Sequence, residues 1–206
     1  MFISESIKLF CVMLKDSKNV EGIARNMKKI IVIGCPGSGK STFSKALHEL
    51  TKIPLFHLDM MYWNSDRTIV EKHIFMEQLN SVLCKEEWII DGNYNSTMEL
   101  RLQACDTVIF LDYPMDVCLE GVRERRGKIR TDMPWVEDAN EEDTEFTQFI
   151  KDYNNQSRSK VMELIEQYSY KDIYIFNNRN ETKDFLEGKR CIQMNGEKMD
   201  ILQENV

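Results

Sequence analysis

Five short apolar runs recur along the chain, separated by longer stretches in which apolar residues follow another period. The runs are rich in β-branched and aromatic residues, which is typical of buried strands; they lie at 29–33, 54–58, 87–90, 107–111 and 172–176. After the first run, Phe43, Ala46, Leu47 and Leu50 fall at i, i+3, i+4 and i+7, one face of a helix. Strands that alternate with helices predict an α/β fold with a parallel sheet and right-handed crossovers.

Further helices are predicted from the same spacing at 71–85, at 96–103, over a segment that carries Val117, Leu119 and Val122, and from 181. A long helix is predicted after residue 145, with one apolar set over 146–153 and a second over 161–168. Residues 132–145 hold seven acids with Pro134 and Trp135, which predicts a mobile surface segment.

The first strand runs directly into a glycine-rich turn that matches the P-loop pattern G-x-x-x-x-G-K-[ST]. Glycines let the backbone pass close to a polyphosphate, and the helix N-terminus adds N–H donors and partial positive charge. Lys40 would neutralise the terminal phosphates, and the Ser41 hydroxyl would bind Mg²⁺. The predicted ATP-binding residues are Gly34, Pro36, Gly37, Ser38, Gly39, Lys40, Ser41 and Thr42.

Two acidic residues end predicted strands, at the sheet edge where α/β proteins bind ligands. Asp91 follows the third strand, in the position of an acid that holds Mg²⁺ through water; the alternative is a cap for the next helix. Asp59 ends the second strand and could accept a proton from an acceptor hydroxyl, or hold it by a hydrogen bond. Tyr62 and Trp63 follow, either to stack on a base or sugar or to line the core.

Arginines cluster between 123 and 130, ahead of the acidic segment. Movable arginines stabilise the charge that phosphoryl transfer spreads over three oxygens, so we predict a lid over about 127–140. Arg123 and Arg126 are the predicted catalytic arginines, and Arg130 is a predicted substrate-binding one; the alternative is a solvated helix end. The isolated Arg101 and Arg158 are further candidates for binding substrate phosphates.

Composition narrows the function classes. The chain has 206 residues, 42% of them hydrophobic and 30% charged, with a net charge of −7. An acidic chain without a basic stretch disfavours direct DNA binding. The six cysteines show no C-x-x-C spacing, so we expect reduced thiols in a cytoplasmic protein and no zinc site. No run approaches the ~20 apolar residues that a membrane span requires.

The sequence also predicts where the domain begins and ends. We expect a P-loop domain over 27–190, a polar tail over 191–206, and an N-terminal extension over 1–26. That extension is either sequence upstream of a natural start at Met27 or a docking helix built on Ile7, Phe10, Cys11 and Leu14.

Several of these motifs occur together in a known family. The chain resembles the bacterial DNA topology modulation protein (FlaR-like) family in four segments: Gly34–Thr42, Asp59–Trp63, Ile90–Tyr94 and Arg123–Gly127. That family is itself similar to adenylate kinase and other P-loop nucleotide kinases. The resemblance runs from about Met27 to about Glu187 and implies a three-layer P-loop NTPase fold with a five-stranded parallel sheet and a short lid. Asn93-Tyr94 stands where adenylate kinases have Phe-Pro, and the lid lacks four cysteines.

Together these features predict a kinase that uses ATP and Mg²⁺ and phosphorylates a nucleotide, a nucleoside or another small hydroxyl compound, as a monomer or homodimer. The alternative is a nucleotide-binding regulator of DNA topology that phosphorylates no metabolite. A GTPase switch is disfavoured, because the guanine-reading [NT]-K-x-D pattern is absent from the sequence.

Overall fold

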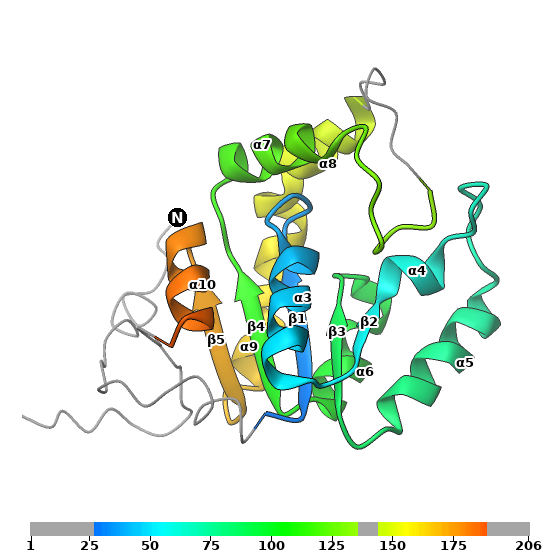
Figure 1. Ribbon diagram of the computed structural model, residues 1–206, viewed down its shortest axis with the longest axis vertical. Coiled ribbons are helices and arrows are strands. Elements are labelled where there is room, and N and C mark those ends of the chain that lie inside the picture. Colours follow the sequence, from blue (N-terminus) through cyan, green and yellow to red (C-terminus); the bar gives the residue numbers. More distant parts are fainter. Residues whose placement is uncertain (1–26, 136–143, 189–206) are drawn as a thin grey trace, which may run out of the picture.

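A computed structural model of the chain describes residues 27–135 and 144–188. The helices and strands alternate, as Figure 1 shows, in the order β1 (Lys29–Gly34), α3 (Lys40–Thr51), β2 (Leu55–His57), α4 (Leu58–Tyr62), α5 (Lys72–Leu83), β3 (Trp88–Asp91), α6 (Asn95–Ala104), β4 (Thr107–Leu111), α7 (Met115–Arg125), α8 (Thr144–Tyr153), η1 (Asn154–Arg158), α9 (Ser159–Gln167), β5 (Asp172–Phe176) and α10 (Arg179–Leu186). The predictions for 1–26, for 191–206 and for the lid beyond residue 135 lie outside the described residues.

The five strands form one parallel sheet in the order β2-β3-β1-β4-β5. Strand β1 lies in the middle and is buried from Ile30 onward, which explains why its sequence is continuously apolar. Strands β2 and β5 are the outer strands, and the carboxyl ends of all five strands lie at the same end of the sheet. The predicted α/β fold with a five-stranded parallel sheet is confirmed.

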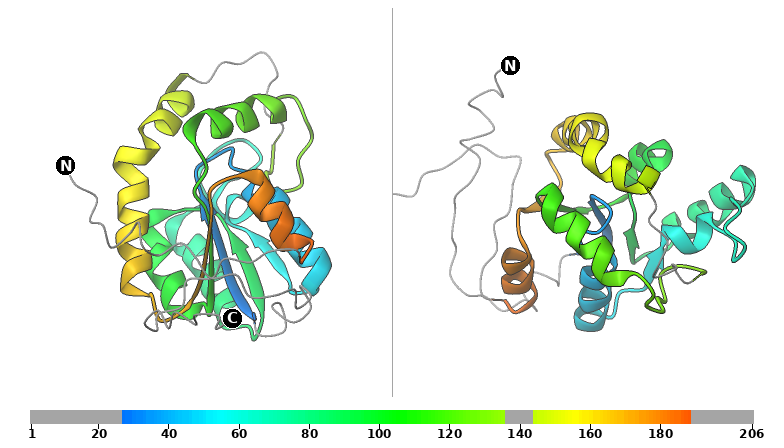
Figure 2. Two further views of the ribbon diagram at one scale, coloured as in Figure 1. Left: turned by 90° about the vertical axis from the view of Figure 1, so that its left-hand side faces the viewer. Right: turned by 90° about the horizontal axis from the view of Figure 1, so that it is seen from above.

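Helices cover both faces of the sheet, which gives the predicted three layers. Helices α3 and α10 pack on one face through Phe43, Leu47 and Phe185. Helices α5, α6 and α9 pack on the other face through Leu79, Leu102 and Ile165. Figure 2 shows this division from the side, and Figure 1 shows α7 crossing above the carboxyl ends of the strands.

The long helix predicted after residue 145 is interrupted by a single π-helical turn, η1. Such a turn inserts an extra residue and rotates the apolar face of the following helix. Accordingly Ile150 and Tyr153 of α8 pack into the same cluster as α3, whereas Val161 and Ile165 of α9 pack on the opposite face of the sheet. The two apolar sets in the sequence thus serve two different layers.

Two local differences from the predictions have clear causes. Helix α4 begins at Leu58, which the sequence predicted as the end of a strand, because the five-residue helix is too short to show a period. Helix α10 begins at Arg179, two residues before the predicted start, since the Asn178 side chain accepts hydrogen bonds from the backbone N–H groups of Asn180 and Glu181. Among the described residues, no helix is both long and apolar enough to cross a bilayer.

Candidate functional site

The P-loop joins β1 to α3 and has the backbone shape that a phosphate requires. Gly39 is the N-cap of α3 with φ 90°, and a Cβ added there would meet no atom within 4 Å. Gly37 also has positive φ, but a Cβ there would approach the Cys118 carbonyl oxygen of α7 to 2.0 Å. The loop is thus open at its helix end, where an anion would meet free N–H groups, and tightly packed against α7 on the other side.

Lys40 lies over its own loop. Its ammonium donates hydrogen bonds to the carbonyl oxygens of Gly34 (2.9 Å) and Cys35 (3.1 Å). Burial lowers the pKa of Lys40, while the negative charges of Asp59 and Asp91 act in the opposite direction. Asp59 of α4 and Asp91 at the end of β3 therefore act on the same cation, as expected if all three surround one reaction centre.

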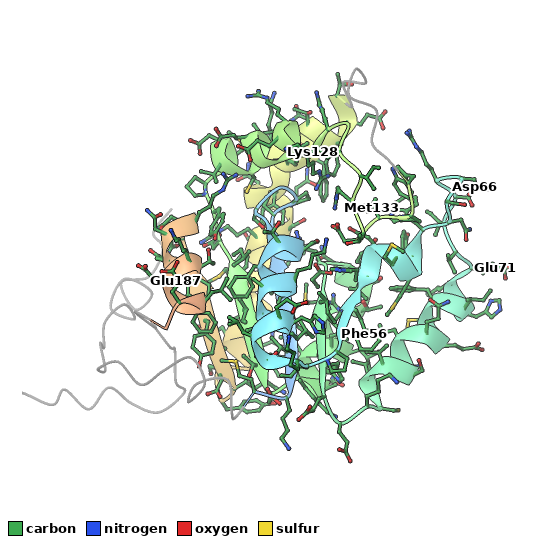
Figure 3. The ribbon with its side chains drawn as sticks, in the orientation of Figure 1. Phe56, Asp66, Glu71, Lys128, Met133 and Glu187 are labelled. Carbon is green, nitrogen blue, oxygen red and sulfur yellow. The ribbon has the colours of Figure 1, made fainter. Side chains whose placement is uncertain are left out.

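A cleft of about 750 Å³ opens beside the P-loop. Its lining comes from several parts of the chain: the P-loop and α3 (Pro36, Gly37, Gly39, Lys40, Ser41, Thr42, Lys45), α4 and the turns after α4 and β3 (Asp59, Trp63, Tyr94), α7 and α8 (Arg125, Phe146), and the segment after α7 (Arg126, Arg130, Asp132, Met133, Trp135). Ser38 instead lines a second cleft, of about 590 Å³, between the P-loop, α7 and α10. Figure 3 places Met133 above α4, so the described part of the predicted lid descends over the larger cleft.

Asp59 stands in the cleft with its orientation set by a tyrosine. The Tyr94 hydroxyl donates a hydrogen bond to Asp59 Oδ1 at 2.6 Å. Burial raises the pKa of Asp59, although the Tyr94 hydrogen bond and the Lys40 charge oppose the shift. A half-buried, oriented carboxylate of raised pKa is suited to accept a proton from a hydroxyl group.

The two aromatic residues after Asp59 have different environments. Tyr62 packs among Phe75 and Tyr94, with ring centroids 5.3 and 4.7 Å away, and so belongs to the apolar layer. Trp63 lines the cleft and meets Trp135 of the lid segment edge to face, at a centroid distance of 5.4 Å. One aromatic residue thus supports the core, and the other joins the acceptor side of the cleft to the lid.

Asp91 is buried, with 4% of its surface exposed. His57 Nδ1 lies 2.8 Å from Asp91 Oδ1, and Oδ2 has no hydrogen-bond partner among the described residues. An ionised carboxylate accepts on both oxygens, so Oδ2 retains capacity for a water molecule. With the Ser41 hydroxyl in the neighbouring loop, this donor set fits Mg²⁺, which keeps several waters and few protein ligands.

Two residues of this region had no assignment from the sequence. His57 orients Asp91, and the Asn93 side chain accepts a hydrogen bond from the Gly34 backbone N–H at 3.0 Å. His57 pairs with Asp91 because β2 and β3 are parallel neighbours in register. The sequence places both His57 and Asp91 at the ends of predicted strands. Predicting their contact would also have required the order of the strands in the sheet. Asn93 and Tyr94, which depart from the adenylate kinase pattern, thus orient the P-loop and Asp59.

Arg101 does not reach the cleft, contrary to the sequence prediction. Its side chain is fully buried, and its guanidinium donates to the carbonyl oxygens of Gly92 (2.8 Å), Asn93 and Tyr94 (3.2 Å). Burial lowers its pKa to about 10. Its oxygen partners are all backbone groups of the turn after β3, and Nη2 also lies 3.7 Å from Met98 Sδ, so Arg101 supports that turn and its side chain is not placed to bind a substrate phosphate.

Replacing Arg101 by methionine is therefore expected to destabilise the protein by about 2–4 kcal/mol, because buried carbonyl groups lose their donors. Urea unfolding measures the change. Gln103→Met, on the exposed side of the same helix, is the control and should change stability little. An Arg101→Met protein of unchanged stability that had lost substrate binding would restore the sequence prediction.

The arginine run divides between the cleft and the solvent. Arg125, Arg126 and Arg130 line the cleft, and the Arg125 guanidinium lies 5.6 Å from the centre of the Phe146 ring. Arg123 is exposed and is not among the residues that line either cleft. Successive residues of a helix point in different directions, so α7 turns Arg125 inward and Arg123 outward. Of the three arginines that the sequence singled out, Arg126 and Arg130 thus line the same cleft, and Arg123 does not.

Arg158 also has a different place from the predicted one. It forms a two-pronged ion pair with Asp112 after β4, with Nε–Oδ1 and N–Oδ2 distances of 2.7 and 2.5 Å. The hydrogen bond to Asp112 raises the pKa of Arg158. The pair joins η1 to the end of β4, and Arg158 is not among the residues that line the cleft.

Asp132 is a cleft residue that the sequence analysis did not single out. Only 3% of it is exposed, and it accepts hydrogen bonds from Lys45 of α3 at 3.1 Å and from Arg130 at 2.5 Å. Burial alone would raise its pKa, but Arg130, Ser41 and Lys45 together hold the pKa well below its usual range. One Asp among the seven acids of 132–145 does not stand out in the sequence. Its contact with Lys45 depends on how the lid segment folds back onto α3.

Comparison with solved structures finds shikimate kinases. The enzyme from Acinetobacter baumannii, in complex with shikimate, is 16% identical, with a TM-score of 0.53 over 81% of this chain and 92% of that one. The enzyme from Bacteroides thetaiotaomicron is 20% identical (78% and 94% covered, TM-score 0.46), and that from Aquifex aeolicus vf5 is 19% identical (76% and 90%, TM-score 0.44). No protein-family model and no curated protein sequence matches the chain.

The sheet order, the P-loop and the likeness to the Acinetobacter structure define the chain as a protein of the P-loop NTPase fold. A structural likeness at 16% identity establishes the fold alone.

Proposed function

We propose that this protein is an ATP-dependent phosphotransferase that moves the γ-phosphoryl group of ATP to a hydroxyl of a small acceptor. The observation that carries the proposal is that one cleft holds a P-loop, a half-buried carboxylate of raised pKa (Asp59) and the arginines Arg126 and Arg130. Phosphate binding, proton removal and charge stabilisation are what phosphoryl transfer requires. The acceptor is a nucleotide, a nucleoside or another small hydroxyl compound.

The proposed site has an ATP side, formed by the P-loop, and an acceptor side, formed by Asp59. Backbone N–H groups at Gly39–Ser41 and the Lys40 ammonium would bind the phosphates, with the nucleoside in the second cleft. Ser41, with Asp91 acting through water, would hold Mg²⁺, which neutralises charge on the phosphates. Asp59 would receive the proton as the acceptor oxygen bonds to the γ-phosphorus. The bond from that phosphorus to the bridging oxygen breaks, ADP leaves, and Arg126 and Arg130 stabilise the charge on the transferring group.

The choice of a small acceptor rests on the cleft and on the fold. The Acinetobacter kinase is in complex with shikimate, and it shares the fold of this chain. The cleft here has room for a small molecule between Asp59, Trp63 and the lid segment. The finer resemblance to the DNA topology modulation family is not confirmed by the comparisons, and a regulator without kinase activity would make no use of an oriented carboxylate at Asp59.

The test is a screen for ATP consumption by the purified protein over nucleosides, nucleotides and sugars. We expect one acceptor class to stimulate ATP turnover, and Asp59→Asn to lower turnover by about 10²–10⁴-fold while ATP binding is retained. Asp116→Asn, which changes an exposed acid of α7, is the matched control. ATP binding without turnover for any acceptor, and with no effect of Asp59→Asn, would favour the regulator.

The same residue sets the expected pH dependence. Asp59 accepts a proton only when ionised, and burial raises its pKa, so the rate should fall as pH decreases through that raised value. The acidic limb should therefore lie above the range of an ordinary carboxyl group, ~3.9. Asp59→Asn should remove this limb from the profile of any residual activity.

A further inference from the structure

The lid segment brings a carboxylate to the side of the P-loop on which Mg²⁺ would bind. Asp132 lies between α7 and α8 in the sequence, yet it is almost fully buried against α3 through Lys45. Burying a carboxylate is costly unless cations and hydrogen bonds surround it. Its cationic partners are Lys45 Nζ at 3.1 Å and Arg130 at 2.5 Å, so this position is built for a negative charge beside positive ones.

The position of Lys45 relates Asp132 to the proposed metal ligand. Lys45 follows Ser41 by four residues on α3, and residues four apart lie on the same face of a helix, one turn apart. Ser41, Lys45 and Asp132 line the same cleft, and Ser41 is among the groups that lower the pKa of Asp132. A carboxylate that is ion-paired with Lys45, one helical turn from Ser41, lies on the side of the P-loop where the Ser41 hydroxyl would hold a cation.

We propose that Asp132 is the contribution of the lid to the Mg²⁺ site, through a metal-bound water or as a direct ligand. This inference rests on the proposed function, because it requires Mg²⁺ to arrive with ATP at Ser41. Mg²⁺ commonly takes one or two carboxylates together with substrate phosphates, and Asp91 provides one from the sheet. Asp132 provides a second from the lid segment, which already packs on α3 through Lys45, so bound Mg²⁺–ATP would hold that segment in place beside the P-loop.

A rival role is a plain latch, in which the Lys45 ion pair merely holds the lid segment. The two roles differ in their dependence on the metal. Loss of a latch weakens nucleotide binding equally with and without Mg²⁺. Loss of a metal ligand, or of an acceptor for a metal-bound water, removes only the gain in nucleotide affinity that Mg²⁺ provides. Trp135, three residues beyond Asp132, meets Trp63 edge to face, and this pair supplies a fluorescence signal for the position of the lid segment.

The experiment measures binding of a non-hydrolysable ATP analogue by calorimetry and tryptophan fluorescence during Mg²⁺ titration. For Asp132→Asn we expect the half-saturating Mg²⁺ concentration to rise about 10-fold or more, as on loss of outer metal-site partners, with metal-free binding unchanged. Asp132→Glu should retain part of the Mg²⁺ effect, Lys45→Met should retain the Mg²⁺ dependence, and Asp116→Asn should behave as wild type.

The outcomes separate this inference from the proposed function. An Mg²⁺ dependence of Asp132→Asn equal to that of wild type, or an equal loss of affinity with and without Mg²⁺, overturns the inference and leaves the kinase proposal intact. Wild-type protein that binds no ATP analogue at all overturns the proposed function itself. If Asp132→Asn fails to fold, Asp132→Glu decides: an Mg²⁺ requirement unchanged by the longer side chain contradicts a ligand role.

Discussion

Replacing Lys40 by alanine is expected to lower ATP turnover by about 10²–10³-fold or more, because it removes the cation nearest the transferring phosphate. The ammonium now lies on the Gly34 and Cys35 carbonyl oxygens, a position from which it can turn to a phosphate without moving the backbone. ATP affinity should fall strongly as well, since Lys40 would bind the ground-state phosphates. Calorimetry of ATP with Mg²⁺ measures the affinity, and a coupled assay measures the turnover.

Folding should be retained, because the described partners of Lys40 are two carbonyl groups of its own loop. Lys72→Ala, which removes an exposed lysine at the start of α5, is the control for a change in net charge. If Lys40→Ala bound ATP as wild type does, the Gly34–Ser41 turn would not be a functional P-loop. A folded variant with normal binding but no turnover would confine the role of Lys40 to the transition state.

Removing the Arg126 side chain is expected to lower turnover by about 10³-fold, with a smaller loss of ATP affinity. Arg126 ends α7 at the rim of the cleft, where the lid segment begins. Charge on the transferring phosphoryl group is more spread in the transition state than in ATP, so a lid arginine contributes more to turnover than to binding. Steady-state kinetics of Arg126→Ala, beside ATP binding by the same protein, measures both quantities.

Arg123→Ala is the matched control, since Arg123 belongs to the same run but is exposed on the outer side of α7. The sequence analysis assigned both arginines to catalysis, and the structure separates them. A change in turnover within about twofold for Arg126→Ala, ~0.4 kcal/mol in barrier, would contradict the lid assignment. A large loss for Arg123→Ala would show that the lid rearranges enough to bring Arg123 into the cleft.

Local features of the chain were predictable from the sequence. The P-loop needs only adjacent residues: a buried strand, glycines that accept positive φ, and a helix N-terminus. Strands β4 and β5 were predicted with their observed bounds, because continuous apolar runs between polar residues mark strands buried on both faces. The alternation of strands and helices was enough to predict a parallel sheet with helices on both sides.

Residue pairs far apart in the chain could not be predicted in this way. The Asp59–Tyr94 hydrogen bond and the His57–Asp91 contact depend on β2 and β3 being neighbours, which periodicity does not specify. Arg101 looked like a phosphate ligand because a charged residue is usually exposed, whereas here the carbonyl groups after β3 supply its partners inside the core.

The lid shows the same division. Its arginines were visible as a run, but which of them face the cleft depends on the rotation of α7 above the P-loop, so Arg126 lines the cleft and Arg123 is exposed. Asp132 gains its role only because the segment after α7 folds back onto α3, where Lys45 balances the charge of a buried carboxylate. Short-range backbone preferences select the P-loop and the strands, whereas long-range packing decides which charged groups are desolvated together in the cleft.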